Sequence, residues 1–301
     1  MTAKLQRMVE LSARTAHALA SDTERWADFL RTAAWNYKYP FQDQLLIYAQ
    51  RPDATACAPI EVWNRKLNRW VKRGAKGIAL IEDRSSSLGL RHVFDVSDTQ
   101  SRQSHAVPLW RMEEADTEAV LETLENAFGH EREPGMELPA SLLAAARNAV
   151  EDHSADYVRL LLAERDNSLL EELDASHVEL LFRETAQHAV AYMAMARCGQ
   201  EPSHYINSDD LSSVGYFTTL PALSHLGAAI SDVAETMLRE IETTVRALHR
   251  DRERPLPRTI ATQESIPHNE DKPRERMIEH GTDVHAERGI TCCRIWRSRR
   301  R

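Results

Sequence analysis

The sequence predicts an α+β fold, in which N-terminal helices with a small antiparallel sheet precede an all-α acidic domain and a disordered tail. Apolar residues recur at helical spacing over the first fifty positions, short β-branched runs and glycines follow, and helical spacing then returns until about residue 248. These changes of pattern divide the chain, and we expect its parts at residues 1–110, 111–250 and 251–301.

Helical periodicity dominates the N-terminus. Apolar side chains share one face of an expected helix over residues 2–20. Ser21, followed three residues later by Glu24, has the spacing of a capping box, so we expect the second helix to begin there. A short third helix is expected over residues 41–50, between two prolines.

The next stretch has the character of short strands. Val71, residues 78–81 and residues 93–96 are expected to form a small antiparallel sheet, with a polar loop at residues 85–89. Two glycines flank a basic turn after Val71, and we expect that turn to be the tip of a hairpin.

Beyond Trp110 the pattern is helical, with Cys198-Gly199 as a helix stop. Helices are expected at residues 117–128, 138–150, 155–162, 176–198 and 221–248. From Asp251 onward, proline and charge predict disorder. The last twelve residues hold five arginines and no acid, which fits either a nucleic-acid-binding tail or the end of a truncated or frameshifted reading frame.

The composition excludes several classes of protein. The 301 residues are 42% apolar but contain no uninterrupted apolar stretch of about 18 residues, so we expect no membrane partner. The opening MTAKLQRMVE lacks the apolar region of a signal peptide, and a cytoplasmic location is expected. The four cysteines show no CxxC spacing, which argues against a disulfide scaffold and a cysteine-rich zinc site.

A net charge of -8 conceals an uneven distribution. Residues 61–77 carry six bases and one acid, whereas residues 113–179 carry eighteen acids and four arginines. Eleven of the nineteen aromatic residues lie between Trp26 and Trp110, so aromatic side chains and local positive charge coincide in the N-terminal part. Nucleic acid therefore remains a candidate partner.

Residues 43–99 carry a recognisable order of features. A helix rich in glutamine precedes a tryptophan-flanked basic stretch, then RGAKGIAL and finally VFDVS. This order resembles the N-terminal single-stranded-DNA-binding domain of ArdC-type antirestriction proteins. Residues 1 to about 250, with FLRTAAWNYKYPF and DQLLIYAQRPDATACA, also resemble the N-terminal region of very large helicase and methyltransferase proteins of conjugative elements in gut bacteria. The resemblance implies single-stranded DNA as a partner and helicase or methyltransferase domains in a longer parent protein.

The sequence departs from the enzymes of these families. ArdC-type proteins continue into a zincin-like metalloprotease domain with HExxH, but the comparable helix here reads FRETAQHAVAYMAMARCG. Glu184 and His188 lie one helical turn apart, a pair that is more often structural than zinc-binding. Neither GxxxxGK[ST] nor NPP[YF] occurs. We therefore expect no enzymatic activity, no catalytic residue, no metal and no cofactor.

A sequence-tolerant single-strand binder needs cations for phosphates and aromatic platforms for unstacked bases. The expected DNA-binding residues are Trp63, Arg65, Lys66, Arg69, Trp70, Lys72, Arg73 and Lys76, with Lys38, Tyr39, Gln44 and Tyr48 as a second tier. The plainer alternatives stay open: either tryptophan can be a core residue, and the cations can be a solvated face. Asp95, Asp98 and Thr99 fit a turn cap better than a metal site.

The leading hypothesis is a non-enzymatic single-stranded-DNA-binding module of a mobile element. One alternative is a degenerate zincin-like metalloprotease relative without activity. Another is a truncated N-terminal structural module of a large helicase or methyltransferase.

Overall fold

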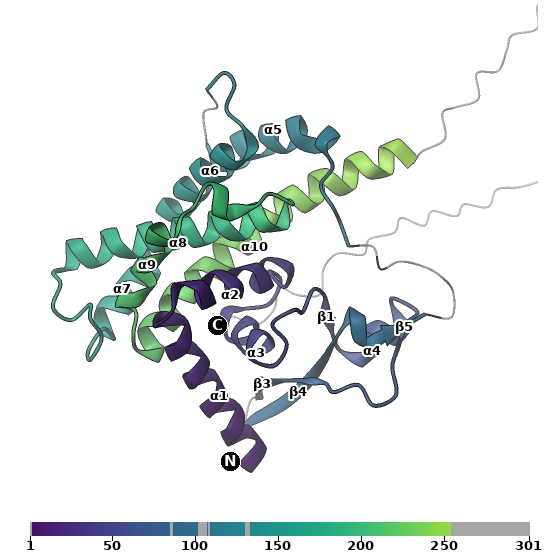
Figure 1. Ribbon diagram of the computed structural model, residues 1–301, viewed down its shortest axis with the longest axis horizontal. Coiled ribbons are helices and arrows are strands. Elements are labelled where there is room, and N and C mark those ends of the chain that lie inside the picture. Colours follow the sequence, from purple (N-terminus) through teal and green to yellow (C-terminus); the bar gives the residue numbers. More distant parts are fainter. Residues whose placement is uncertain (1, 85–86, 102–106, 108, 130–132, 254–301) are drawn as a thin grey trace, which may run out of the picture. The chain divides into compact units, whose positions relative to one another are not determined.

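The computed structural model describes residues 2–84, 87–101, 107, 109–129 and 133–253 (Figure 1). The described residues form one compact unit. The final helix runs to Glu253, slightly past the expected boundary at residue 250, and the rest of the expected disordered tail lies outside the described residues.

The N-terminal helices are confirmed as α1 (Ala3–Ala20), α2 (Thr23–Trp35) and α3 (Phe41–Gln50). The predicted start of α2 is wrong by one residue. Asp22 caps α2 by accepting hydrogen bonds from the backbone N–H groups of the next turn, whereas Ser21 ends α1 and donates its hydroxyl to the carbonyl of His17. Aspartate and serine both favour the N-cap position, and here Asp22 occupies it rather than Ser21.

The strands form two small antiparallel sheets. Strand β4 lies between β1 and β3 in one sheet, and β2 pairs with β5 in the other. The elements of this region are β1 (Cys57–Ala58), α4 (Ile60–Arg65), β2 (Trp70–Val71), β3 (Ile78–Arg84), β4 (Ser87–Asp95), the 3-10 turn η1 (Val96–Asp98) and β5 (Thr99–Gln100).

Two strand predictions need correction. Residues 87–89 belong to β4 rather than to a loop, because the β3–β4 ladder extends to the pair Arg84–Ser87. The basic turn is not the tip of a hairpin, because β2 and β3 on either side of it belong to different sheets. Helix α4 was not predicted at all, and residue 96 begins η1 rather than ending a strand.

The helices of the C-terminal part agree with the prediction to within a few residues. Gly199 has a φ of 80° just after α8, which confirms the expected helix stop. The elements are η2 (Glu114–Asp116), α5 (Thr117–Phe128), α6 (Leu138–His153), α7 (Ala155–Ala163), α8 (Ala175–Arg197), η3 (Pro202–His204), α9 (Ser208–Ser212), η4 (Ser213–Tyr216) and α10 (Leu220–Glu253).

One continuous core joins the N-terminal helices to the acidic helices. Trp26, Phe29 and Phe41 are buried in the same cluster as side chains of α8 and α10. Helix α3 packs so closely on α10 that a Cβ at Gly227 would lie 2.3 Å from the ring of Phe41. The expected boundary at 110/111 therefore does not separate two cores.

A smaller cluster fixes the three-stranded sheet to α3. Leu46 and Ile47 of α3 pack against Ile78, Leu80 and Val93 of the sheet. Helix α3 thus lies between α10 and β3, and it holds the strands in a defined place relative to the helical body.

Candidate nucleic-acid interface

The six cations between Arg65 and Lys76, here termed the basic segment, lie at the end of α4, in the connection from α4 to β2 and in the turn after β2. Asn68 adopts a left-handed conformation with a φ of 50° and turns the chain out of α4. The following turn closes with a hydrogen bond of 3.1 Å from the Ala75 N–H to the Lys72 carbonyl, and Gly74 supplies its φ of 86°.

Most of the basic segment is exposed. Within the part of the chain that the structure describes, no carboxylate forms an ion pair with any of the exposed cations, and Lys72 donates its ammonium to the carbonyl of Ser97 at 2.8 Å. These cations are Arg65, Lys66, Lys72, Arg73 and Lys76. Together they form a positively charged surface.

The Arg69 side chain forms hydrogen bonds within the fold. Its Nε donates to Thr99 Oγ1 at 2.7 Å and its Nη2 donates to the Thr99 carbonyl at 3.2 Å, so the half-buried guanidinium ties the end of α4 to β5. This arrangement corrects the expected role of Arg69, whose donors are engaged by the protein itself.

The turn η1 organises the surroundings of the basic segment. Buried Asp95 accepts hydrogen bonds from the backbone N–H groups of Thr55, Ala56 and Ser97 and from the Ser97 hydroxyl. Burial raises the pKa of Asp95, but these hydrogen bonds outweigh it and hold the pKa below its usual value. The expectation that Asp95 caps a turn is confirmed.

Asp98 is also neutralised internally. Its carboxylate pairs with Arg51 at 3.1 Å, and the same guanidinium donates to Asp53 and to the Ser97 hydroxyl. Sequence reasoning missed Arg51, because its partner Asp98 is 47 residues away and no local pattern relates the two.

The two tryptophans differ. Trp63 is 1% exposed and donates its indole N–H to the Phe94 carbonyl at 2.9 Å, so it is a core residue and not a platform for bases. Trp70 is half-buried on β2, and it remains a candidate for contact with a base.

The second-tier residues on the preceding helices serve the fold. Lys38 pairs with Glu242 of α10 at 2.6 Å, and the Tyr39 hydroxyl donates to a backbone carbonyl of β1. Gln44 is buried and donates to the Tyr39 carbonyl, and Tyr48 packs edge-on against Phe29. The structure therefore brings the exposed cations and Trp70 together but leaves these four residues out of the surface.

Glu184 and His188, the pair on the helix compared with the zincin-like domain, lie on α8. His188 contacts the carbonyl of Asp210 through Nδ1 at 3.2 Å, and Glu184 is exposed. Among the residues that the structure describes, neither belongs to a cluster of three possible metal ligands.

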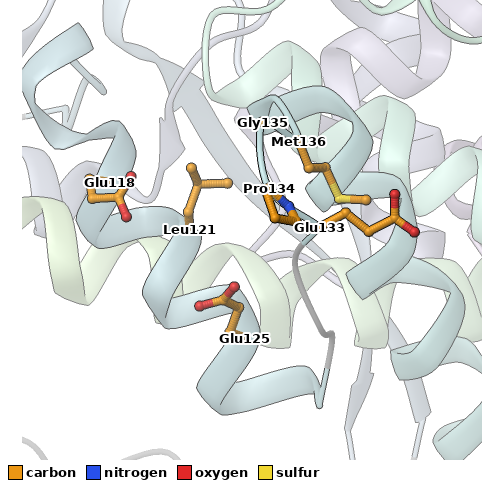
Figure 2. Close-up of a pocket in the computed structure, with 7 residues that line it drawn as sticks. All are labelled: Glu118, Leu121, Glu125, Glu133, Pro134, Gly135 and Met136. Atoms are coloured by element: carbon orange, nitrogen blue, oxygen red, sulfur yellow. The ribbon is translucent and has the colours of Figure 1, made fainter.

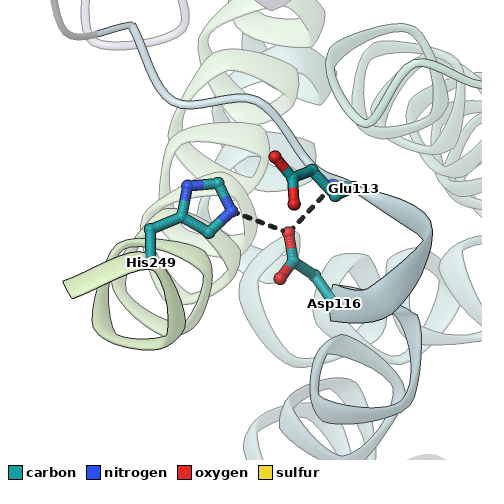
Figure 3. A group of neighbouring side chains, drawn as sticks. All are labelled: Glu113, Asp116 and His249. Carbon is teal, nitrogen blue, oxygen red and sulfur yellow. Dashed lines mark hydrogen bonds and ion pairs between the residues drawn. The ribbon is translucent and has the colours of Figure 1, made fainter. Parts of the chain in front are cut away.

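Glu113, Asp116 and His249 do cluster, as Figure 3 shows. His249 Nε2 lies 3.0 Å from Asp116 Oδ2, and Arg252 donates to the other Asp116 oxygen at 2.6 Å and to Glu113 at 3.1 Å. Arg252 already supplies the compensating positive charge. The cluster is therefore an ion-pair network that fastens the end of α10 to η2.

An open pocket of about 490 Å³ lies between α5 and the loop before α6 (Figure 2). Three glutamates line it, together with Leu121, Met136 and a Pro-Gly turn. Its acidic lining would repel phosphates, so the pocket does not extend the candidate interface.

Compared with protein-family models, curated proteins and solved structures, the chain matches none. Among the described helices, none combines the length and apolarity that a bilayer crossing requires.

Proposed function

We propose that the chain binds single-stranded DNA through the exposed cations of the basic segment, without reading the sequence of the strand. The observation that carries this proposal is the set of exposed cations between Arg65 and Lys76, for which the described part of the chain provides no carboxylate partner. Phosphates of a nucleic acid are suitable partners for such a surface, and release of their counterions provides binding free energy.

Three neighbouring acids support the proposal because their carboxylates are engaged by Arg51 and by backbone donors and not by the exposed cations of the basic segment. Asp53 and Asp98 pair with Arg51, and Asp95 accepts several N–H donors. The local potential at the basic segment is therefore positive, although the whole chain carries a net charge of -8.

The single-stranded form of the partner is supported by the resemblance to the N-terminal domain of ArdC-type proteins. That resemblance also provides the biological setting, in which the chain protects or guides DNA during transfer of a mobile element.

Fluorescence anisotropy with a labelled oligonucleotide over a salt series tests the proposal. The variant Lys72→Ala, Arg73→Ala, Lys76→Ala is expected to lower the slope of log affinity against log salt by about 2, since each phosphate contact contributes about 0.7 for a single strand. The control removes the same charge from exposed cations elsewhere, in Arg14→Ala, Arg147→Ala, Arg250→Ala. Equal effects of the two triple variants, or no binding at low salt, would overturn the proposal.

A further inference from the structure

We propose that the open face of β4, centred on Phe94, is the platform on which bases of the single strand stack. This inference rests on the proposed function and adds to it the element that would distinguish a single strand from a duplex. Trp63 cannot serve because it is buried, so a binder of unstacked bases needs other accessible rings, and the face of β4 offers them in addition to Trp70 of β2.

The register of the sheet separates its two faces. Ile78 pairs with Val93, and both side chains pack against α3. Successive side chains of a strand alternate between faces, so Leu88, Leu90, His92 and Phe94 lie on the face opposite to Val93. None of these four belongs to a buried cluster.

This face is partly accessible, although Ala79, the cross-strand partner of His92, is buried. Leu88 is 47% exposed, His92 is exposed, and Leu90 and Phe94 are half-buried. Apolar and aromatic side chains are therefore presented to solvent side by side, where the flat ring of Phe94 and the imidazole of His92 can contact bases.

Gly77 connects this face to the basic segment. A Cβ at Gly77 would lie 3.1 Å from Phe94 Cζ and 3.3 Å from the Cβ of His92, so any side chain at this position would lie across the ring. The edge of the Phe94 ring therefore lies against Gly77, which directly follows Lys76. A strand whose phosphates contact the basic segment therefore has its bases within reach of Phe94.

Charge identifies the occupant of this face as part of a polyanion. Lys76 lies beside Phe94 through Gly77, and the Lys4 ammonium lies 2.9 Å from His92 Nε2. Asp83, an acid on the same face, pairs with Leu88 at the end of the hairpin away from the basic segment. Burial and the charge of Lys4 lower the pKa of His92, which favours the neutral form of its ring.

Anisotropy with three ligands of equal length tests the inference: oligo-dT, the corresponding abasic strand, and a duplex. The full chain is expected to bind oligo-dT about 5- to 150-fold more tightly than the abasic strand, the range of one stacked base. Phe94→Leu, which keeps an apolar side chain, is expected to lower this preference at least about fivefold and to leave affinity for the abasic strand unchanged. The matched control Phe128→Leu changes a half-buried ring on α5 and should retain the preference.

The outcomes separate this inference from the proposed function. Binding of all three ligands without a preference for bases, or a preference that survives Phe94→Leu, would overturn the platform but leave phosphate binding by the basic segment in place. Absence of binding to any ligand would overturn both. If Phe94→Leu fails to fold, photocrosslinking of the unaltered chain to a strand that contains 5-iodouracil decides the matter, because the platform requires crosslinks at Phe94 or His92.

Discussion

Replacing Glu242 by glutamine tests how the N-terminal helices are held to α10. The buried carboxylate accepts hydrogen bonds from the Tyr37 hydroxyl, the Lys38 ammonium and the Arg246 guanidinium, at 2.6 to 2.7 Å. Glu242→Gln keeps the shape of the side chain and removes its charge. Since Lys38 and Arg246 then lose their partner, the folded state should be destabilised.

The pH dependence sets the size of the effect. Burial raises the pKa of Glu242, but the partners, Lys38 foremost, outweigh it and bring the pKa to about 2, against 4.5 for an unperturbed glutamate. The difference corresponds to about 3 kcal/mol as an upper value. Because the pKa is lower in the folded than in the unfolded chain, this stabilisation is complete above pH 4.5 and disappears as the pH falls towards 2.

Urea unfolding of the unaltered chain and Glu242→Gln at pH 7, 5, 4 and 3 measures the effect. The difference in free energy of unfolding is expected to be about 1 to 3 kcal/mol at pH 7 and to shrink below pH 4.5. Glu201→Gln is the control: the pKa of Glu201 is also about 2, but its pair with Arg31 is exposed, so its removal should cost less than about 0.5 kcal/mol. A difference for Glu242→Gln that is constant with pH, or no larger than the control, would refute the reasoning.

Four further substitutions test the assignment of side chains to the surface or the core. Arg69→Ala should lower the midpoint of urea unfolding and leave the slope of log DNA affinity against log salt unchanged. Arg65→Ala should lower that slope by about 0.7 without affecting stability. A change of slope in Arg69→Ala together with a loss of stability in Arg65→Ala would contradict the placement of both residues. Trp63→Phe should cost about 1 kcal/mol in unfolding free energy through the lost indole hydrogen bond, and a loss of DNA affinity instead would return Trp63 to the interface. Gly227→Ala should destabilise the chain by about 1 to 3 kcal/mol because its Cβ meets the ring of Phe41, and unchanged thermal unfolding would show that α3 and α10 can move apart.

Local patterns predicted the helices well and the strand pairing poorly. The bounds of α3 and α5 follow from apolar spacing and from a proline or glycine at an end, which are features of the segment itself. The partner of β2 is β5, some thirty residues further on, and both strands are two residues long. Such short strands carry almost no periodicity, so the sequence could not show that the basic turn joins two sheets.

The expected domain boundary failed for a related reason. Charge and aromatic content change near Trp110, but they describe surface composition rather than which apolar faces meet. The apolar faces of α2 and α3 find their partners on α8 and α10, more than a hundred residues later. No composition profile contains that information.

Residue type predicted the positive charge of the candidate site but not which aromatic side chains are accessible to solvent. Trp63 lies in a basic stretch, and its residue type predicts a platform for bases. In the structure, Trp63 lies on α4 and its indole N–H donates a hydrogen bond to the carbonyl of Phe94 in the sheet. Phe94 lies in a strand whose alternation places it on the open face, but recognising this required the register with β3. The burial of Trp63 and the position of Phe94 on the open face both depend on how the strands pair, which residue type does not show.

Screening decides how far the acidic helices can influence the basic segment. At physiological ionic strength the Debye length is about 8 Å, so exposed charges further away than this contribute little to the local potential. The eighteen acids of residues 113–179 therefore oppose DNA binding mainly where a strand passes close to them. The acids near η1 matter more, and their carboxylates are engaged by Arg51 and by the N–H donors around Asp95. Affinity at the basic segment should thus depend on this small network rather than on the net charge of the chain.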